Sequence, residues 1–299
     1  MSLEGLTPRE QREIAWANSS GRVPVVFIHG LWLLAGSWSA WRGPFDDRGY
    51  VTLAPGWPGE PPDVEEARAH PGPLAGRGIA EVTAHFASVL RALERRPVVV
   101  GHSLGGLVAQ RLAGQGLAAV TVAISPAPFR GVLPLPLAAL RSAFPLLRNP
   151  AHRSRAIALT FEQFRYAWAN ALPEPEARAL FEAHHVAAPA RPVFQVATAN
   201  LDPFTEARVE LRHPLRGPLL LVAGEEDHTV PPALVKAAHA LQRRNPGTTE
   251  YAAFSGRGHS LTIDAGWREV AAQVHLFIER TLPPSAPRRG ATPPSGSPR

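Results

Sequence analysis

The sequence contains no cysteine, a single lysine and no long uninterrupted apolar run. The absence of cysteine excludes disulfides, a catalytic thiolate, zinc–thiolate sites and iron–sulfur clusters. The richest apolar stretch, residues 132–147, is interrupted by three prolines and one arginine, so no membrane span is expected. Residues 1–10 lack the basic and then apolar order of a signal peptide, and a cytoplasmic location is therefore expected.

The formal net charge of +6 raises the question of a nucleic-acid partner. The charge is unevenly distributed, because residues 283–299 contribute +3, residues 128–217 contribute +4 and the remainder sums to −1. Most of the chain is thus close to neutral, and no nucleic-acid partner is expected. The arginine excess of residues 128–217 is interpreted as a solvated surface, with a preference for an acidic group on the substrate as the alternative.

Short apolar blocks alternate with stretches of helical period, which predicts parallel β-α-β units in a chain long enough for one large α/β domain. Apolar residues recur on one helical face within 79–93 and again within 267–278, so both segments are predicted helices. The predicted strands are residues 23–28, 51–54, 97–100, 120–125, 218–223 and 249–254.

Residues 128–217 break this alternation, since about 90 residues separate two predicted strands. A loop of that length is rare in a compact domain, so we predict an inserted helical cap there. Residues 1–127 and 218–282 then form the core. Residues 56–78, rich in proline and glycine, are expected to be an irregular excursion. Residues 283–299, with six prolines and no acidic side chain, are expected to be a disordered tail.

The strongest motif is Gly101-His102-Ser103-Leu104-Gly105, which follows a predicted strand and precedes a helix-compatible segment. In this G-x-S-x-G context the serine sits on a strained turn, exposed above the edge of the sheet. The flanking glycines allow two backbones to approach without Cβ clashes. Ser103 is therefore the candidate nucleophile, although serine needs a general base to become reactive.

An acid and a histidine follow two later strands, so that all three groups leave carboxyl ends of parallel strands and can meet at one edge. His259 is the candidate base, and Asp227 is the preferred acid, with Glu225 and Glu226 as rivals in the same loop. The adjacent pair His184-His185 is not expected to bind a metal, because neighbours on a helix diverge by about 100°.

These motifs and their order resemble the α/β-hydrolase superfamily, specifically capped bacterial serine esterases and lipases and the cofactor-free haloperoxidase-like group. The resemblance covers roughly residues 23–282 and includes a His29-Gly30 pair after an early strand. It implies a mostly parallel central sheet flanked by helices, with an inserted helical cap. It also implies an oxyanion hole made by the backbone amides of Leu31 and Leu104. The chain departs from the family pattern in one respect: only about 22 residues precede the His-Gly strand, so the usual first two strands are expected to be shortened or partly absent.

Aromatic residues suggest an apolar substrate pocket between sheet and cap. Trp32 and Phe129 are the preferred substrate-binding residues, since they follow the His-Gly strand and the strand after the nucleophile. The other aromatic side chains considered are interpreted mainly as core: Trp38, Trp57, Phe161, Phe164 and Trp168.

The expected function is that of a serine-dependent carboxylic-ester hydrolase, which cleaves an ester-like bond, carboxylic ester or lactone, of a mainly apolar small molecule through an acyl-enzyme on Ser103. No metal or organic cofactor is expected. An acyltransferase or a perhydrolase would use the same residues, and a non-catalytic ligand receptor that retains them is a further alternative. Serine at this position argues against haloalkane dehalogenases and epoxide hydrolases, which need a carboxylate nucleophile.

Overall fold

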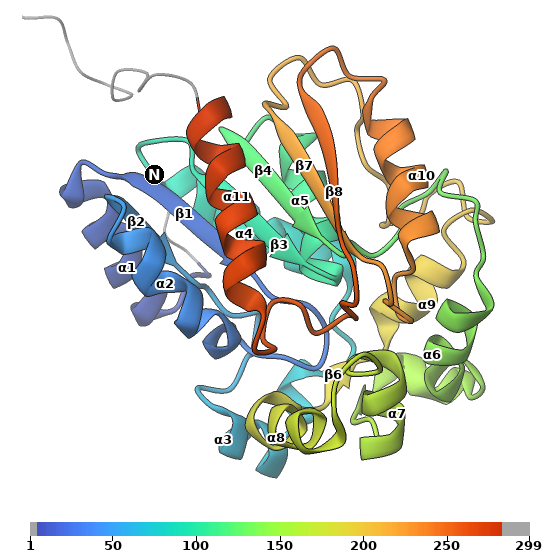
Figure 1. The fold of residues 1–299 in the computed structure, drawn as a ribbon. Coiled ribbons are helices and arrows are strands. Elements are labelled where there is room, and N and C mark those ends of the chain that lie inside the picture. Colours follow the sequence, from blue (N-terminus) through green and yellow to red (C-terminus); the bar gives the residue numbers. More distant parts are fainter. Residues whose placement is uncertain (1–4, 283–299) are drawn as a thin grey trace, which may run out of the picture.

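The computed structural model describes residues 5–282, which form a six-stranded, entirely parallel sheet with the order β2-β1-β3-β4-β7-β8 (Figure 1). Parallel strands are joined by helical crossovers, and these helices cover both faces of the sheet. Most of the strands therefore appear in the sequence as short, nearly continuous apolar blocks. The strands are β1 (Val23–Ile28), β2 (Tyr50–Leu53), β3 (Val98–His102), β4 (Val120–Ile124), β7 (Leu219–Gly224) and β8 (Thr249–Phe254).

Two apolar layers pack against the sheet, one on each face. Alternate side chains of each strand point to opposite faces, so Val26 of β1 joins one layer and Phe27 joins the other. One face is covered by α1 (Pro8–Ser20), α4 (Ile79–Ala92), α5 (Leu104–Ala113) and α10 (Pro232–Gln242). The opposite face is covered by α2 (Ser39–Asp46) and α11 (Trp267–Thr281).

The chain between β4 and β7 is largely helical and lies beside one end of the sheet, below it in Figure 1. Two short strands within it pair in antiparallel fashion. Its elements are α6 (Leu137–Leu147), η3 (Pro150–Ser154), β5 (Ala156–Ile157), α7 (Phe161–Ala167), α8 (Glu174–His184), β6 (Ala188–Pro189) and α9 (Arg191–Ala197).

The predicted mostly parallel sheet flanked by helices is confirmed, and each of the six predicted strands is present within a residue or two. The domain boundaries, including the cap at 128–217, stay predictions. The prediction that residues 56–78 are irregular was wrong in part, because α3 (Val64–Ala69) forms there with Asp63 as its N-cap, followed by η2 (Gly72–Leu74). The predicted tail lies outside the described residues.

The helix α1 was not predicted, although its start is encoded locally. Thr7 and Glu10 form a capping box in which each side chain accepts from the other's backbone amide, and Pro8 occupies the first turn. Within residues 5–282 no strand precedes β1, and the helix α1 is the element before it. No helix of residues 5–282 is long and apolar enough to cross a membrane.

Candidate active site

Ser103 lies at the sharp turn between β3 and α5, with φ 55° and ψ −121°. A non-glycine residue in this region is strained, and the strain is maintained by close packing on both sides. A Cβ on Gly101 would overlap the carbonyl oxygen of Gly105, and a Cβ on Gly105 would overlap that of Ile28. Both glycines of the motif are therefore sterically required, as the sequence predicted.

The side chains of Ser103, His259 and Asp227 form a continuous hydrogen-bonded line. Ser103 Oγ lies 2.9 Å from His259 Nε2, and His259 Nδ1 lies 2.7 Å from Asp227 Oδ2. All three residues are buried, with 6%, 0% and 2% of their surface exposed, respectively. Since they follow β3, β8 and β7, the parallel sheet brings residues from distant parts of the chain to one edge.

Asp227 is held in place by its own loop. Its Oδ1 accepts hydrogen bonds from the backbone amides of Thr229, at 2.8 Å, and Val230, at 2.7 Å, which leaves Oδ2 for the histidine. The two rival carboxylates, Glu225 and Glu226, are exposed to solvent. A buried carboxylate with three donors can orient the imidazole and stabilise its cationic form.

His102, which precedes Ser103 in the chain, forms a hydrogen bond to the backbone of His259. Its Nε2–H donates to the carbonyl oxygen of His259 at 2.9 Å. Burial, together with the nearby His259, lowers the pKa of His102 well below its usual value, so the ring stays neutral. Because the His102 ring is neutral, it places no positive charge beside His259.

The loop after β1 runs directly against Ser103. A Cβ on Gly30 would lie 2.7 Å from the Cβ of Ser103 and 3.3 Å from its Oγ, so only glycine fits. Leu31 follows this contact, and Leu104 is the first residue of α5, where backbone amides have no acceptor within the helix. The amide end of a helix also favours a developing negative charge.

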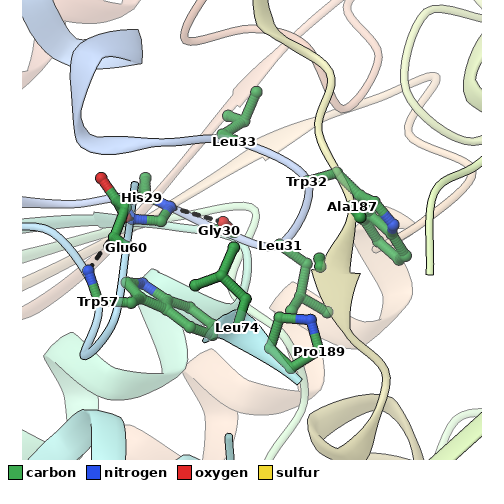
Figure 2. A pocket seen from close by; sticks show the side chains of 11 residues that line it. His29, Gly30, Leu31, Trp32, Leu33, Trp57, Glu60, Leu74, Ala187 and Pro189 are labelled. Carbon is green, nitrogen blue, oxygen red and sulfur yellow. Dashed lines mark hydrogen bonds and ion pairs between the residues drawn. The ribbon is translucent and has the colours of Figure 1, made fainter. Parts of the chain in front are cut away.

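A buried carboxylate fixes the loop that carries Leu31. Glu60 Oε2 lies 2.6 Å from His29 Nε2 and accepts from the Trp57 amide at 3.0 Å, and Oε1 accepts from the Ala35 amide at 2.8 Å. The His29 ring stacks on Trp57, with ring centroids 5.4 Å apart. Figure 2 shows Glu60 between His29 and Trp57. One side chain thus ties the loop after β1 to the loop after β2.

A small apolar pocket adjoins this loop (Figure 2). Trp32 lines it, whereas Phe129 is buried and is not among its lining residues. Trp32 has φ 63°, and its indole N–H donates to the carbonyl of Ile157 at 3.0 Å. The lining is formed by His29, Gly30, Leu31, Trp32, Leu33, Trp57, Glu60, Leu74, Ala187, Ala188 and Pro189.

A family model described as the alpha/beta hydrolase family matches residues 25–273. The chain belongs to this family. Membership supports a hydrolase, and the match includes most of β1 and all of the other five strands of the sheet, together with the Ser103, Asp227 and His259 positions. No curated protein sequence matches this alpha/beta hydrolase significantly.

Solved structures with the same fold are distant in sequence. The monoacylglycerol lipase of Paleococcus ferrophilus is 22% identical, with a TM-score of 0.62, and the match covers 86% of this chain and 95% of that chain. A pyrethroid hydrolase from Sphingobium faniae JZ-2 is 20% identical, with a TM-score of 0.59 and coverage of 86% and 97%. An extracellular alpha/beta-hydrolase from a Paenibacillus species is 18% identical, with a TM-score of 0.61 and coverage of 85% and 98%.

Sequence reasoning missed the contacts that residues 166–170 of this hydrolase make with the site. The ring of Trp168 packs edge-on against His259, with centroids 4.6 Å apart, and its carbonyl accepts from the Ser260 amide at 3.0 Å. The carbonyl of Ala167 accepts from the Thr229 hydroxyl at 2.7 Å. Residues 166–170 therefore form hydrogen bonds both to the loop that carries Asp227 and to the loop that carries His259.

No local signal distinguished Trp168 from an ordinary core aromatic, because His259 and Ser260, its partners at the site, lie about 90 residues further along the chain. Glu60 was missed for the same reason, since its importance comes from partners in two separate loops.

Proposed function

We propose that this alpha/beta hydrolase is a serine hydrolase that cleaves a carboxylic ester or lactone of a mainly apolar small molecule. The observation that carries the proposal is the buried line from Ser103 Oγ through His259 to Asp227, with hydrogen bonds of 2.9 and 2.7 Å. A serine hydroxyl becomes nucleophilic when a positioned base removes its proton, and this geometry provides such a base.

In the first half of the reaction, His259 Nε2 accepts the proton of Ser103 as Oγ attacks the ester carbonyl carbon. The oxyanion that forms would accept hydrogen bonds from the amide of Leu31, which follows the Gly30 contact with Ser103, and from the amide of Leu104, the residue after Ser103. The imidazolium then protonates the leaving alcohol, and the C–O bond to the alcohol breaks. Asp227 remains ionised throughout and stabilises the imidazolium.

In the second half, His259 removes a proton from water, which attacks the acyl-enzyme carbonyl. The second tetrahedral intermediate expels Ser103 Oγ, which regains its proton from His259, and the carboxylic acid leaves. This chemistry needs no metal and no organic cofactor. The proton returns to the serine, so the site is regenerated after each turnover.

We propose further that residues 128–217 act as the cap of the site and that the apolar pocket receives part of the substrate. Trp32 lines the pocket and is hydrogen-bonded to Ile157 of this segment, so it is the better supported of the two substrate-binding candidates. Phe129 is buried in the same apolar core layer as Trp32 but does not line the pocket.

The proposal is tested by labelling the purified protein with a fluorophosphonate and by assaying nitrophenyl esters of increasing acyl length. The wild type is expected to label and to hydrolyse short esters, and Ser103→Ala is expected to lose both properties. Ser125→Ala is a matched control, because Ser125 is also buried at a strand end with positive φ. Failure of the wild type to label would contradict the catalytic proposal and favour a ligand receptor.

The fate of the acyl group is tested by product analysis with water and an alcohol in competition. A hydrolase is expected to release mainly the free acid at low alcohol concentration. Predominant ester formation under those conditions would identify an acyltransferase, and peroxide in place of the alcohol tests perhydrolysis in the same way.

A further inference from the structure

The helix α6 and the loop before it turn large apolar side chains toward solvent. Only one residue of α6, Leu146, is buried. The exposed fractions of Phe144 and Leu137 are 62% and 83%. We call the exposed apolar side chains of this segment the α6 face: Leu133, Leu135, Leu137, Leu140 and Phe144.

The α6 face is continuous along the helix. Leu137, Leu140 and Phe144 are spaced by three and four residues, which places them on one side. Arg141 and Arg148 follow the same spacing and are exposed at its margin. Figure 1 shows α6 at the outer edge of the molecule, next to α7 and α9. An apolar helix face directed away from the core marks an interaction surface.

The loop that contains Asn200 adds two exposed apolar side chains to this surface. Asn200 Nδ2 donates to the carbonyl of Val132 at 2.8 Å, and its Oδ1 accepts from the Gly131 amide at 2.7 Å. These bonds hold Leu201 and Phe204, exposed by 84% and 93%, beside the start of the α6 face. The loop also carries the carboxylate of Asp202, which accepts from the amide of Phe204.

The charge of the segment has one sign. Residues 129–161 contain five arginines and no acidic residue. Four of these arginines are exposed, and none forms an ion pair with a carboxylate within residues 5–282: Arg141, Arg148, Arg153 and Arg155. Arg141 stacks on the ring of Tyr166, with the guanidinium carbon 4.1 Å from the centroid.

We propose that the α6 face docks the protein onto the surface of a bilayer that contains anionic lipids. Leucine and phenylalanine suit the boundary between headgroups and acyl chains, and long arginine side chains reach the lipid phosphates. Self-association fits less well, because a symmetric dimer through this face would bring the arginines of two copies together. The combination of apolar side chains and unpaired positive charge is complementary to a negatively charged lipid surface.

Docking would bring the proposed active site close to the membrane. The hydroxyl of Ser142 on α6 donates to the carbonyl of His228, the residue after Asp227, at 3.0 Å. The helix α6 also packs against α7, which precedes Trp168. Lipid binding is nevertheless independent of catalysis and can be measured in the Ser103→Ala variant.

The test is flotation of the full-length protein with vesicles of phosphatidylcholine, with or without phosphatidylglycerol. The wild type is expected to float with the anionic vesicles and to bind the neutral vesicles much more weakly. The double variant Leu137→Glu with Phe144→Glu should lower the partition coefficient at least about tenfold. Arg148→Glu with Arg153→Glu should lower it by at least about tenfold too, with a weaker dependence on salt.

The matched control combines Leu276→Glu and Arg244→Glu, which remove an exposed leucine and an exposed arginine elsewhere on the surface. It is expected to bind like the wild type. All positions are exposed, so circular dichroism should confirm folding of every variant. The proposal is overturned if the wild type does not float, or if both α6 variants bind like the wild type. It is also overturned if light scattering shows a dimer that Phe144→Glu converts to a monomer.

Discussion

Replacement of Glu60 by alanine should impair both folding stability and catalysis, because this carboxylate ties together two loops beside the nucleophile. It accepts hydrogen bonds from the amides of Ala35 and Trp57 and pairs with His29 at 2.6 Å. Its side chain and that of His29 are only 7% and 3% exposed, so water cannot readily replace the lost partner.

The size of the effect on stability follows from these contacts. A hydrogen bond to a buried charged group contributes about 1.5–3 kcal/mol, and removal of one partner leaves the buried groups that it contacted unsatisfied. The three contacts share one side chain and are not additive. We therefore expect Glu60→Ala to lower the free energy of unfolding by about 3 kcal/mol. Glu60→Gln should cost less, since the amide keeps one acceptor and the original size.

The effect on catalysis depends on the proposed role of the Leu31 amide. The loop that Glu60 holds begins at His29, and loss of one oxyanion donor typically lowers kcat by about 100- to 1000-fold. Partial displacement should give a decrease of about 10- to 100-fold in kcat with a smaller change in KM, because the donor acts mainly in the transition state.

The assay combines denaturant unfolding with steady-state hydrolysis of a short nitrophenyl ester, at a temperature where every variant is folded. Glu66→Ala is the control, since Glu66 lies nearby on α3 and forms only an exposed pair with His70. The reasoning is refuted if Glu60→Ala keeps the wild-type unfolding midpoint and kcat. A loss of stability with unchanged kcat would separate the structural role of Glu60 from positioning of the Leu31 amide.

Three further outcomes are expected. Asp227→Asn should lower kcat by about 10³- to 10⁴-fold while leaving the fold intact, because the amide favours the wrong tautomer of His259, and a rate near that of the wild type would contradict the assignment. Ala187→Leu should narrow the apolar pocket and reduce kcat/KM for a butyrate ester more than for an acetate ester; equal effects would exclude the pocket as a substrate site. Burial, aided by Arg48, lowers the pKa of His275 from 6.5 to about 4, so the unfolded chain takes up a proton in this range that the folded chain does not. The free energy of unfolding should thus fall by up to about 3 kcal/mol as the pH drops from 6.5 to 4, and His275→Phe should remove this loss in urea titrations at several pH values.

The parallel sheet could be predicted because its strands are encoded by local composition. The inner strands are buried on both faces and therefore appear in the sequence as short apolar runs, as in residues 120–124, whereas the edge strand β8 is only partly buried. The turn at Ser103 was equally readable, since overlap with neighbouring carbonyls demands glycine at 101 and 105. The helix α1 was overlooked even though its capping box is a local signal.

The arrangement of side chains that meet across the fold could not be predicted in the same way. Glu60 has no distinctive local pattern, and its partners become visible only when β1 and β2 lie side by side. Trp168 resembled any core aromatic in a helical pattern, yet its ring lies on His259. The apolar side chains of Leu137, Leu140 and Phe144 would suit a buried helix equally well, and the fold leaves them exposed.

The sequence by itself determined the alternation of strands and helices, the strained serine turn and the chain order of Ser103, Asp227 and His259. These features depend on steric and hydrophobic preferences of neighbouring residues, which act over a few positions. Only the tertiary structure decided which carboxylate reaches His259, which side chains fix the loop of Leu31 and which apolar face meets solvent. Those outcomes depend on distances between segments far apart in the chain, and packing of the whole sheet sets these distances.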